Sequence, residues 1–217
     1  PYIRPRDILK SEAGLSAGDR QNKLLNAIVR HYQNLHEQAL ALRDETGEDL
    51  PIITTGHLTA VGASSSESVR DIYIGSLEAL PISAFPDADY IALGHIHRSQ
   101  ILGAKEHIRY SGSPIPLSFD ELNQEKSVVL AEFDGSKLIS TRCLDIPSFQ
   151  PLFTVKGSSN SVITQLKQLA DTLEGEQIAW LSIEITEGDY PPDARRAVEA
   201  AAAELPVEVL LHRGRSP

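Results

Sequence analysis

The sequence contains no methionine and a single cysteine, Cys143. One cysteine excludes an internal disulfide framework and suits a reducing compartment. Because the chain opens on Pro1 and lacks methionine throughout, we expect it to be a fragment of a longer protein. Basic residues are also few: 20 lysines and arginines face 30 aspartates and glutamates, and the net charge of −10 argues against nucleic-acid binding through a basic surface alone.

Long apolar runs are absent as well. No segment approaches the roughly 18 consecutive apolar residues of a membrane span, and the N-terminus has no signal-peptide pattern. The 217 residues are 41% hydrophobic and 23% charged, which is typical of a globular protein with a substantial core. We therefore expect a soluble, cytoplasmic chain with no membrane association, forming one large domain or one domain with a small companion.

The first part of the chain predicts one long helix and several short strands. Apolar residues spaced three and four apart predict a helix from Asp19 to Asp44; its apolar face comprises Leu24, Ile28, Tyr32, Leu35, Ala39 and Leu42. The β-branched run 52–55 predicts a buried strand. Further extended segments are expected at 69–74, 90–93, 107–110, 127–133 and 137–144, the last two joined as a hairpin by an Asp134-Gly135 turn.

The pattern changes after the proline-flanked segment 147–151. Strands are expected at 152–155, 178–185 and 207–211, and helices at 162–173 and at 194–203, where Pro191 and Pro192 can open the second helix. The order is β-α-β-α-β within about 65 residues, a compact α/β unit. The fold class expected for the whole chain is therefore mixed α/β, or α+β.

Two of the expected strands end in the same dipeptide, Gly-His. His57 follows one strand, and His95 and His97 follow the other. Because ligands gather at the carboxyl ends of strands in open α/β sheets, these imidazoles can converge there and suit Mn, Zn or Fe. The alternative is a set of structural histidines, which we favour for His31, His36 and His107; the residues alone therefore indicate a metal site without settling it.

Three longer strings resemble one family. Segments 53–64, 89–98 and 109–114, together with 1–7 and 69–75, are similar to the SbcD nuclease subunits of bacteria, which are calcineurin-like metallophosphoesterases. The resemblance implies that residues 1–148 are the C-terminal part of a metallophosphoesterase β-sandwich flanked by helices. It implies that residues 149–217 are an SbcD-type capping domain, and that the C-terminal tail of the family is missing.

The resemblance also implies site residues and partners. His57 and His95 would bind one Mn(II) ion and His97 a second, with Mg(II) as the alternative metal. Gly112 and Ser113 would lie near the substrate. Two interpretations stay open for the basic residues of the cap, which either contact phosphate or simply face solvent. These residues are Lys156, Lys167, Arg195, Arg196, Arg213 and Arg215. The implied activity is exonuclease cleavage of double-stranded DNA ends and endonuclease cleavage of single strands and hairpins, with the ATPase SbcC, in recombination, repair and replication. The expected assembly contains a homodimer of the nuclease subunit within a heterotetramer.

The chain also departs from the family pattern. It has no Asp-x-His and no Asn-His pair, so the family's bridging carboxylate and its acid-base histidine are missing. No catalytic residue is therefore assigned, and we expect the fragment alone to be inactive. Two alternatives stay open: a phosphoesterase for a non-DNA substrate, and a non-catalytic scaffold with a decayed site. The net charge weighs little against DNA here, because two divalent ions would supply positive charge locally.

Overall fold

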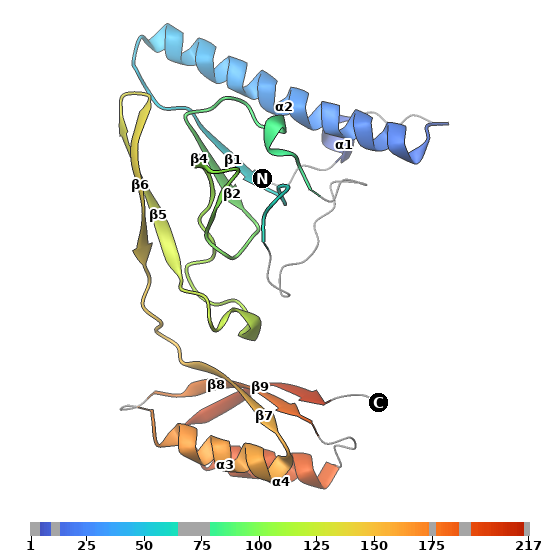
Figure 1. Cartoon of the computed structure of the whole chain (residues 1–217), viewed down its shortest axis with the longest axis vertical. Coiled ribbons are helices and arrows are strands. Elements are labelled where there is room, and N and C mark those ends of the chain that lie inside the picture. The colour runs from blue at the N-terminus through green and yellow to red at the C-terminus, as the bar shows by residue number, and fades with distance from the viewer. Residues whose placement is uncertain (1–4, 10–13, 65–78, 174–176, 187–191, 215–217) are drawn as a thin grey trace. The chain divides into compact units, whose positions relative to one another are not determined.

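A computed structural model describes residues 5–9, 14–64, 79–173, 177–186 and 192–214, and they form two compact units. The first unit comprises Pro1–Leu117 and Gln124–Ile146, and the second comprises Ser118–Asn123 and Pro147–Pro217. Helices and strands are mixed in both units, so the expected α/β class is confirmed (Figure 1). Within the described ranges, none of the helices is both long enough and apolar enough to cross a membrane.

The long helix predicted from the apolar spacing is α2, Ala17–Thr46. A short helix, α1 (Pro5–Ile8), precedes it and was not predicted. The Ser16 side chain caps α2 by accepting a hydrogen bond from the Asp19 N–H, and Gly47 ends the helix in the left-handed conformation with φ 67°.

Only the N-terminal half of the predicted apolar face of α2 is buried, by Leu24, Ile28 and Tyr32. Leu35 and Leu42 are 50% and 61% exposed, so the predicted apolar face continues beyond the part of the helix that is buried. The apolar spacing reports which side of a helix is apolar, whereas burial also needs a neighbouring element along the whole length. Beside Leu35 the helix borders an open groove of about 270 Å³ toward β1.

A four-stranded sheet forms the centre of the first unit. Its strand order is β1 (Ile53–His57), β2 (Tyr90–Gly94), β4 (Lys105–Tyr110) and β3 (Gln100–Leu102). β1, β2 and β4 run parallel, whereas β3 pairs antiparallel with β4. The three predicted strands are present, and β3 was not predicted. Among the described strands β1 lies at the edge of this sheet, and Ile53 is half exposed, so the expectation that it is a buried strand was wrong.

The core of this unit lies between α2 and the sheet. Its largest fully buried side chains are Ile28, Leu80, Ile91, Leu102 and Tyr110. A 3-10 turn, η1 (Ile82–Ala84), leads into β2. The segment predicted as extended at 69–74 lies outside the described residues.

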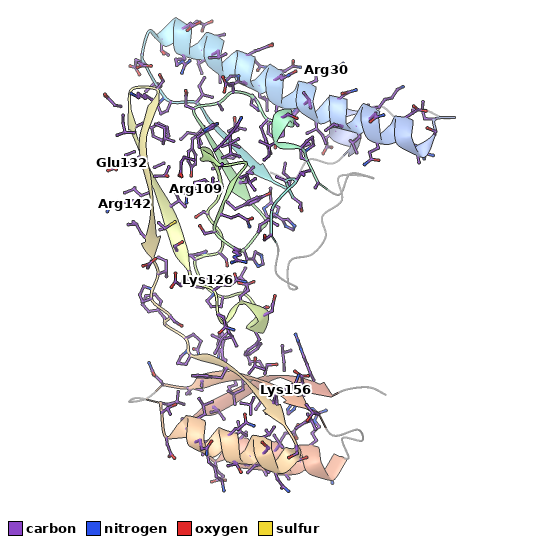
Figure 2. All side chains as sticks on the ribbon, viewed as in Figure 1. Arg30, Arg109, Lys126, Glu132, Arg142 and Lys156 are labelled. Carbon is purple, nitrogen blue, oxygen red and sulfur yellow. The ribbon has the colours of Figure 1, made fainter. Side chains whose placement is uncertain are left out.

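The predicted hairpin consists of β5 (Ser127–Asp134) and β6 (Lys137–Asp145), joined by a turn in which Gly135 has φ 58°. The hairpin contacts β4 through the buried Arg109, whose Nη1 donates to Thr141 Oγ1 at 2.7 Å (Figure 2). At the turn, Asp49 accepts side-chain and backbone hydrogen bonds from Ser136, which lower the pKa of the Asp49 carboxyl. The hairpin is therefore held against the rest of the first unit at its turn and along β6.

The second unit has the predicted order β7 (Leu152–Gly157), α3 (Ser159–Ala170), β8 (Ala179–Ile185), α4 (Pro192–Ala203) and β9 (Val207–Gly214). The three strands form one parallel sheet in the order β7-β8-β9, and both helices pack on its apolar core. α3 starts three residues earlier than predicted, because Ser158 caps it by accepting from the Ser161 N–H. A 3-10 turn, η2 (Phe119–Glu121), also belongs to this unit.

Candidate metal centre

The two Gly-His dipeptides meet at one edge of the first sheet. β1 and β2 run parallel with His57 opposite Gly94, so His57 and His95 lie at the carboxyl ends of neighbouring strands. The centroids of the two imidazole rings are 5.2 Å apart, with their planes inclined at 60°. The side-by-side arrangement predicted from the sequence is thus present for this pair.

Two local features shape the pair: an unusual backbone conformation at His95 and a glycine at position 94. His95 has φ 98°, outside the regions that residues with a Cβ normally occupy. Such strain concentrates at functional sites, where the surrounding structure holds it in place. Gly94 leaves room for the neighbouring ring, because a Cβ there would lie 3.3 Å from His57 Nδ1.

The two rings differ in exposure. The His57 side chain is exposed to solvent, whereas His95 is partly buried and its Nε2 atom is buried. Ile96, the next residue, is only 2% exposed and anchors the segment in the core. One ring is therefore open to a ligand from solvent, and the other is held by the protein.

The loop that follows His57 is fixed by Tyr110, which is completely buried on β4. The Tyr110 hydroxyl donates to the Leu58 carbonyl at 2.7 Å and accepts from the Ala60 N–H at 2.8 Å. Burial raises the pKa of Tyr110 to about 12, so the hydroxyl keeps its proton at neutral pH. Sequence reasoning missed this residue, because its pattern is that of an ordinary strand tyrosine.

The loop that follows His95 packs against the Gly112-Ser113 segment. The Ser113 N–H donates to the His97 carbonyl at 3.0 Å, and a Cβ on Gly112 would lie 2.8 Å from that same oxygen. The structure therefore places Gly112 and Ser113 beside the backbone of His97. Their contact with a substrate stays a prediction.

The donor chemistry of the pair suits a divalent metal, because neutral imidazoles bind Mn, Zn and Fe. Over the described parts of the chain, no group of three or more His, Cys, Asp or Glu residues is arranged to hold a metal ion. The structure therefore brings His57 and His95 together and does not gather His97 with them into such a group. The site of three histidines stays a prediction.

The basic residues proposed for the second unit are partly engaged with carboxylates. Arg195 donates from Nε to Glu199 at 2.8 Å, and this hydrogen bond lowers the pKa of the Glu199 carboxyl. Lys156 donates to Glu184 at 2.6 Å. Arg196 lies on α4 next to Arg195, while Arg215 lies outside the described residues. Phosphate binding by Arg195 and Arg196 stays a prediction.

Comparison with known proteins gives one consistent result. A family model, SbcD_C, described as the type 5 capsule protein repressor C-terminal domain, matches residues 148–216. The SbcD subunit of nuclease SbcCD from Escherichia coli K12 is 52% identical over 213 residues, which is 98% of this chain and 52% of that protein. Proteins of the same name from Bacillus subtilis and Rhodobacter capsulatus are 33% and 29% identical, over 63% and 80% of this chain and 35% and 41% of their own lengths. The chain spans about half the length of the curated relatives it matches.

Proposed function

We propose, from the premise that this chain belongs to the SbcD family of nuclease subunits, that it supplies part of a metal-dependent nuclease centre acting on DNA phosphodiester bonds. The observation that carries the proposal is the pairing of His57 and His95 at the carboxyl ends of β1 and β2. The 52% identity to a nuclease subunit favours a DNA-cleaving metallophosphoesterase over a metallophosphoesterase for a non-DNA substrate.

The proposed ligands are His57 and His95 for one Mn(II) ion and His97 for a second, with Mg(II) as the alternative. When bound, such a pair of ions neutralises phosphate charge and lowers the pKa of a water molecule. The chain itself orients the imidazoles: the strained His95 backbone and the space left by Gly94 set the ring of His57 against that of His95. Each ligand must be a neutral imidazole to bind, because the ring nitrogen that coordinates the metal must carry a free electron pair.

The proposal assigns only part of the centre to these 217 residues. Three imidazoles without a bridging carboxylate hold two ions weakly, because metal charge in such sites is normally balanced by Asp or Glu. We therefore propose that the chain alone does not cleave DNA, and that the whole protein does. Partnership with the ATPase SbcC, double-stranded ends and hairpins as substrates, and a nuclease-subunit homodimer within a heterotetramer belong to the same proposal; the name of the relatives supports the first of these.

The test compares DNA cleavage by the whole protein and by the 217-residue chain, with Mn(II) and with chelator. Hairpin and blunt-ended duplex substrates are used in parallel. We expect Mn-dependent cleavage by the whole protein with SbcC, and none by the chain alone. Cleavage by the chain would refute the division of the centre, and a whole protein inactive with every metal would favour the scaffold alternative.

Single variants of the whole protein test the ligand assignment. His57→Ala and His95→Ala are each expected to reduce cleavage at least ~100-fold, since a lost ligand costs more than a lost supporting contact. His36→Ala is the matched control, because His36 lies on α2 and borders the groove beside β1 rather than the histidine pair. Wild-type rates in His57→Ala and His95→Ala would exclude both as ligands.

A further inference from the structure

A buried lysine lies directly behind the histidine loop. Lys126 immediately precedes β5 and is 7% exposed (Figure 2). A buried ammonium is costly unless hydrogen bonds replace its hydration. Lys126 Nζ donates to Ser113 Oγ at 2.9 Å, to the His97 carbonyl at 3.4 Å and to Gln124 Oε1 at 3.4 Å. These acceptors replace water around the buried ammonium.

Lys126 and Ser113 both donate to one atom, the carbonyl oxygen of His97. It accepts from the Ser113 N–H at 3.0 Å, from Ser113 Oγ at 3.4 Å and from Lys126 Nζ at 3.4 Å. The Ser113 hydroxyl accepts from Lys126 and donates to His97, so it relays one contact to the other. The backbone of His97 is therefore tied to two chain segments that are distant in sequence.

The approach of these segments is close enough to require glycine. Gly112 has φ 82°, and a Cβ there would lie 2.8 Å from both the His97 carbonyl oxygen and the Ser99 nitrogen. Both of those are backbone atoms, which cannot move aside as a flexible side chain can. On the preceding side, Ile96 anchors the same segment in the core. The position of His97 along the loop is thereby restricted from two directions.

We propose that Lys126 is a positioning residue for His97: its ammonium, with Ser113, holds the His97 backbone so that the imidazole is presented to a metal ion. The role rests on the proposed function, because it matters to chemistry only if His97 is a ligand. Supporting contacts of this kind set ligand orientation, and losing one typically weakens metal binding about 10–100-fold. A lysine that merely filled the core would have no such effect on metal binding.

The test uses four variants of the whole protein. Lys126→Met removes the charge and the donors but keeps the length of the side chain. Lys126→Arg keeps a cationic donor, and Ser113→Ala removes only the relay hydroxyl. Lys137→Met is the matched control, because Lys137 is an exposed lysine at the start of β6, in the hairpin that follows Lys126.

Three quantities are measured: Mn(II) affinity by electron paramagnetic resonance, kcat and KM for a hairpin DNA, and hydrogen exchange of the Ser113 amide without metal. For Lys126→Met we expect about 10–100-fold weaker binding of one Mn(II) ion, a fall in kcat with KM changed less than about twofold, and at least about tenfold faster exchange at Ser113. Lys126→Arg restores most of the affinity, Ser113→Ala reproduces part of the loss, and Lys137→Met matches wild type.

Each failure has a distinct signature. Unchanged Mn(II) affinity in Lys126→Met and in Ser113→Ala, with only a lower unfolding temperature, would overturn the positioning role. If Lys126→Met does not fold, Ser113→Ala and Lys126→Arg decide the question by the same measurements. If the wild-type protein binds no Mn(II), the proposed function fails. If the wild-type protein binds Mn(II) but Lys126→Met leaves hydrogen exchange at the Ser113 amide unchanged, only the positioning role is refuted.

Discussion

Replacing Tyr110 by phenylalanine removes one oxygen atom and two buried hydrogen bonds. The ring stays in the core, while the Leu58 carbonyl and the Ala60 N–H lose the partner that lies 2.7 and 2.8 Å away. Leu58 and Ala60 are 2% and 1% exposed, so solvent cannot readily replace the hydroxyl. Two hydrogen bonds at about 1 kcal/mol each, plus the cost of two poorly satisfied backbone groups, give a loss of about 2–4 kcal/mol in unfolding free energy.

Urea denaturation followed by circular dichroism measures this loss, and hydrogen exchange at the Ala60 amide locates it. Tyr32→Phe is the comparison, because the Tyr32 side chain borders the open groove between α2 and β1. Removing the Tyr32 hydroxyl should lower the unfolding free energy by less than about 1 kcal/mol. A loss for Tyr110→Phe no larger than that for Tyr32→Phe, with unchanged exchange at Ala60, would refute the reasoning.

Three further predictions concern smaller changes. Gly94→Ala should weaken Mn(II) binding in titrations while lowering stability by less than about 1 kcal/mol, because the new Cβ would press on His57 Nδ1 at 3.3 Å and leave the core intact; undiminished binding would contradict this. The pKa of Asp49 is lowered by its hydrogen bonds to Ser136, so the stability that this carboxylate contributes is present above its ordinary pKa of 3.8 and is lost as the pH falls through the lower folded-state value; Asp49→Asn should flatten the acid limb of a stability-pH curve. Burial lowers the pKa of His212 from 6.5, so the second unit should lose stability as the pH falls from above 6.5 through the folded-state pKa, and His212→Gln should abolish that part of the slope in chemical denaturation.

The elements with strong local signals were predicted well. The three-and-four spacing from Leu24 onward located α2, and the Asp134-Gly135 turn between two extended runs located the hairpin. In the second unit, Pro192 at the first position of α4 and the apolar runs on either side indicated the β-α-β-α-β order. These signals are local, because propensity, capping and turn chemistry depend on neighbouring residues.

The errors arose where burial depends on distant elements. Leu35 and Leu42 lie on the apolar face of the helix, yet they are 50% and 61% exposed. Ile53 belongs to a β-branched run, yet among the described strands β1 pairs only with β2. The sequence pattern shows which face of a helix or strand is apolar. It does not show whether another element packs against that face.

The sequence predicted some residues of the candidate site and not others. The repeated Gly-His dipeptide singled out His57 and His95, and parallel strands explain why they meet. The φ of 98° at His95 and the burial of Lys126 had no sequence signal, since a lysine before a strand is normally a surface charge. A buried lysine becomes recognisable only when its acceptors, Ser113 and the His97 carbonyl, are seen together.

The claim that the histidine edge of the first sheet is a metal centre is tested most directly by anomalous X-ray diffraction from crystals of the whole protein grown with manganese. The account predicts an anomalous peak within bonding distance of the imidazoles of His57 and His95, and its loss in His57→Ala. Well-ordered rings of His57 and His95 with no manganese peak between them, or a peak bound only elsewhere, would contradict it.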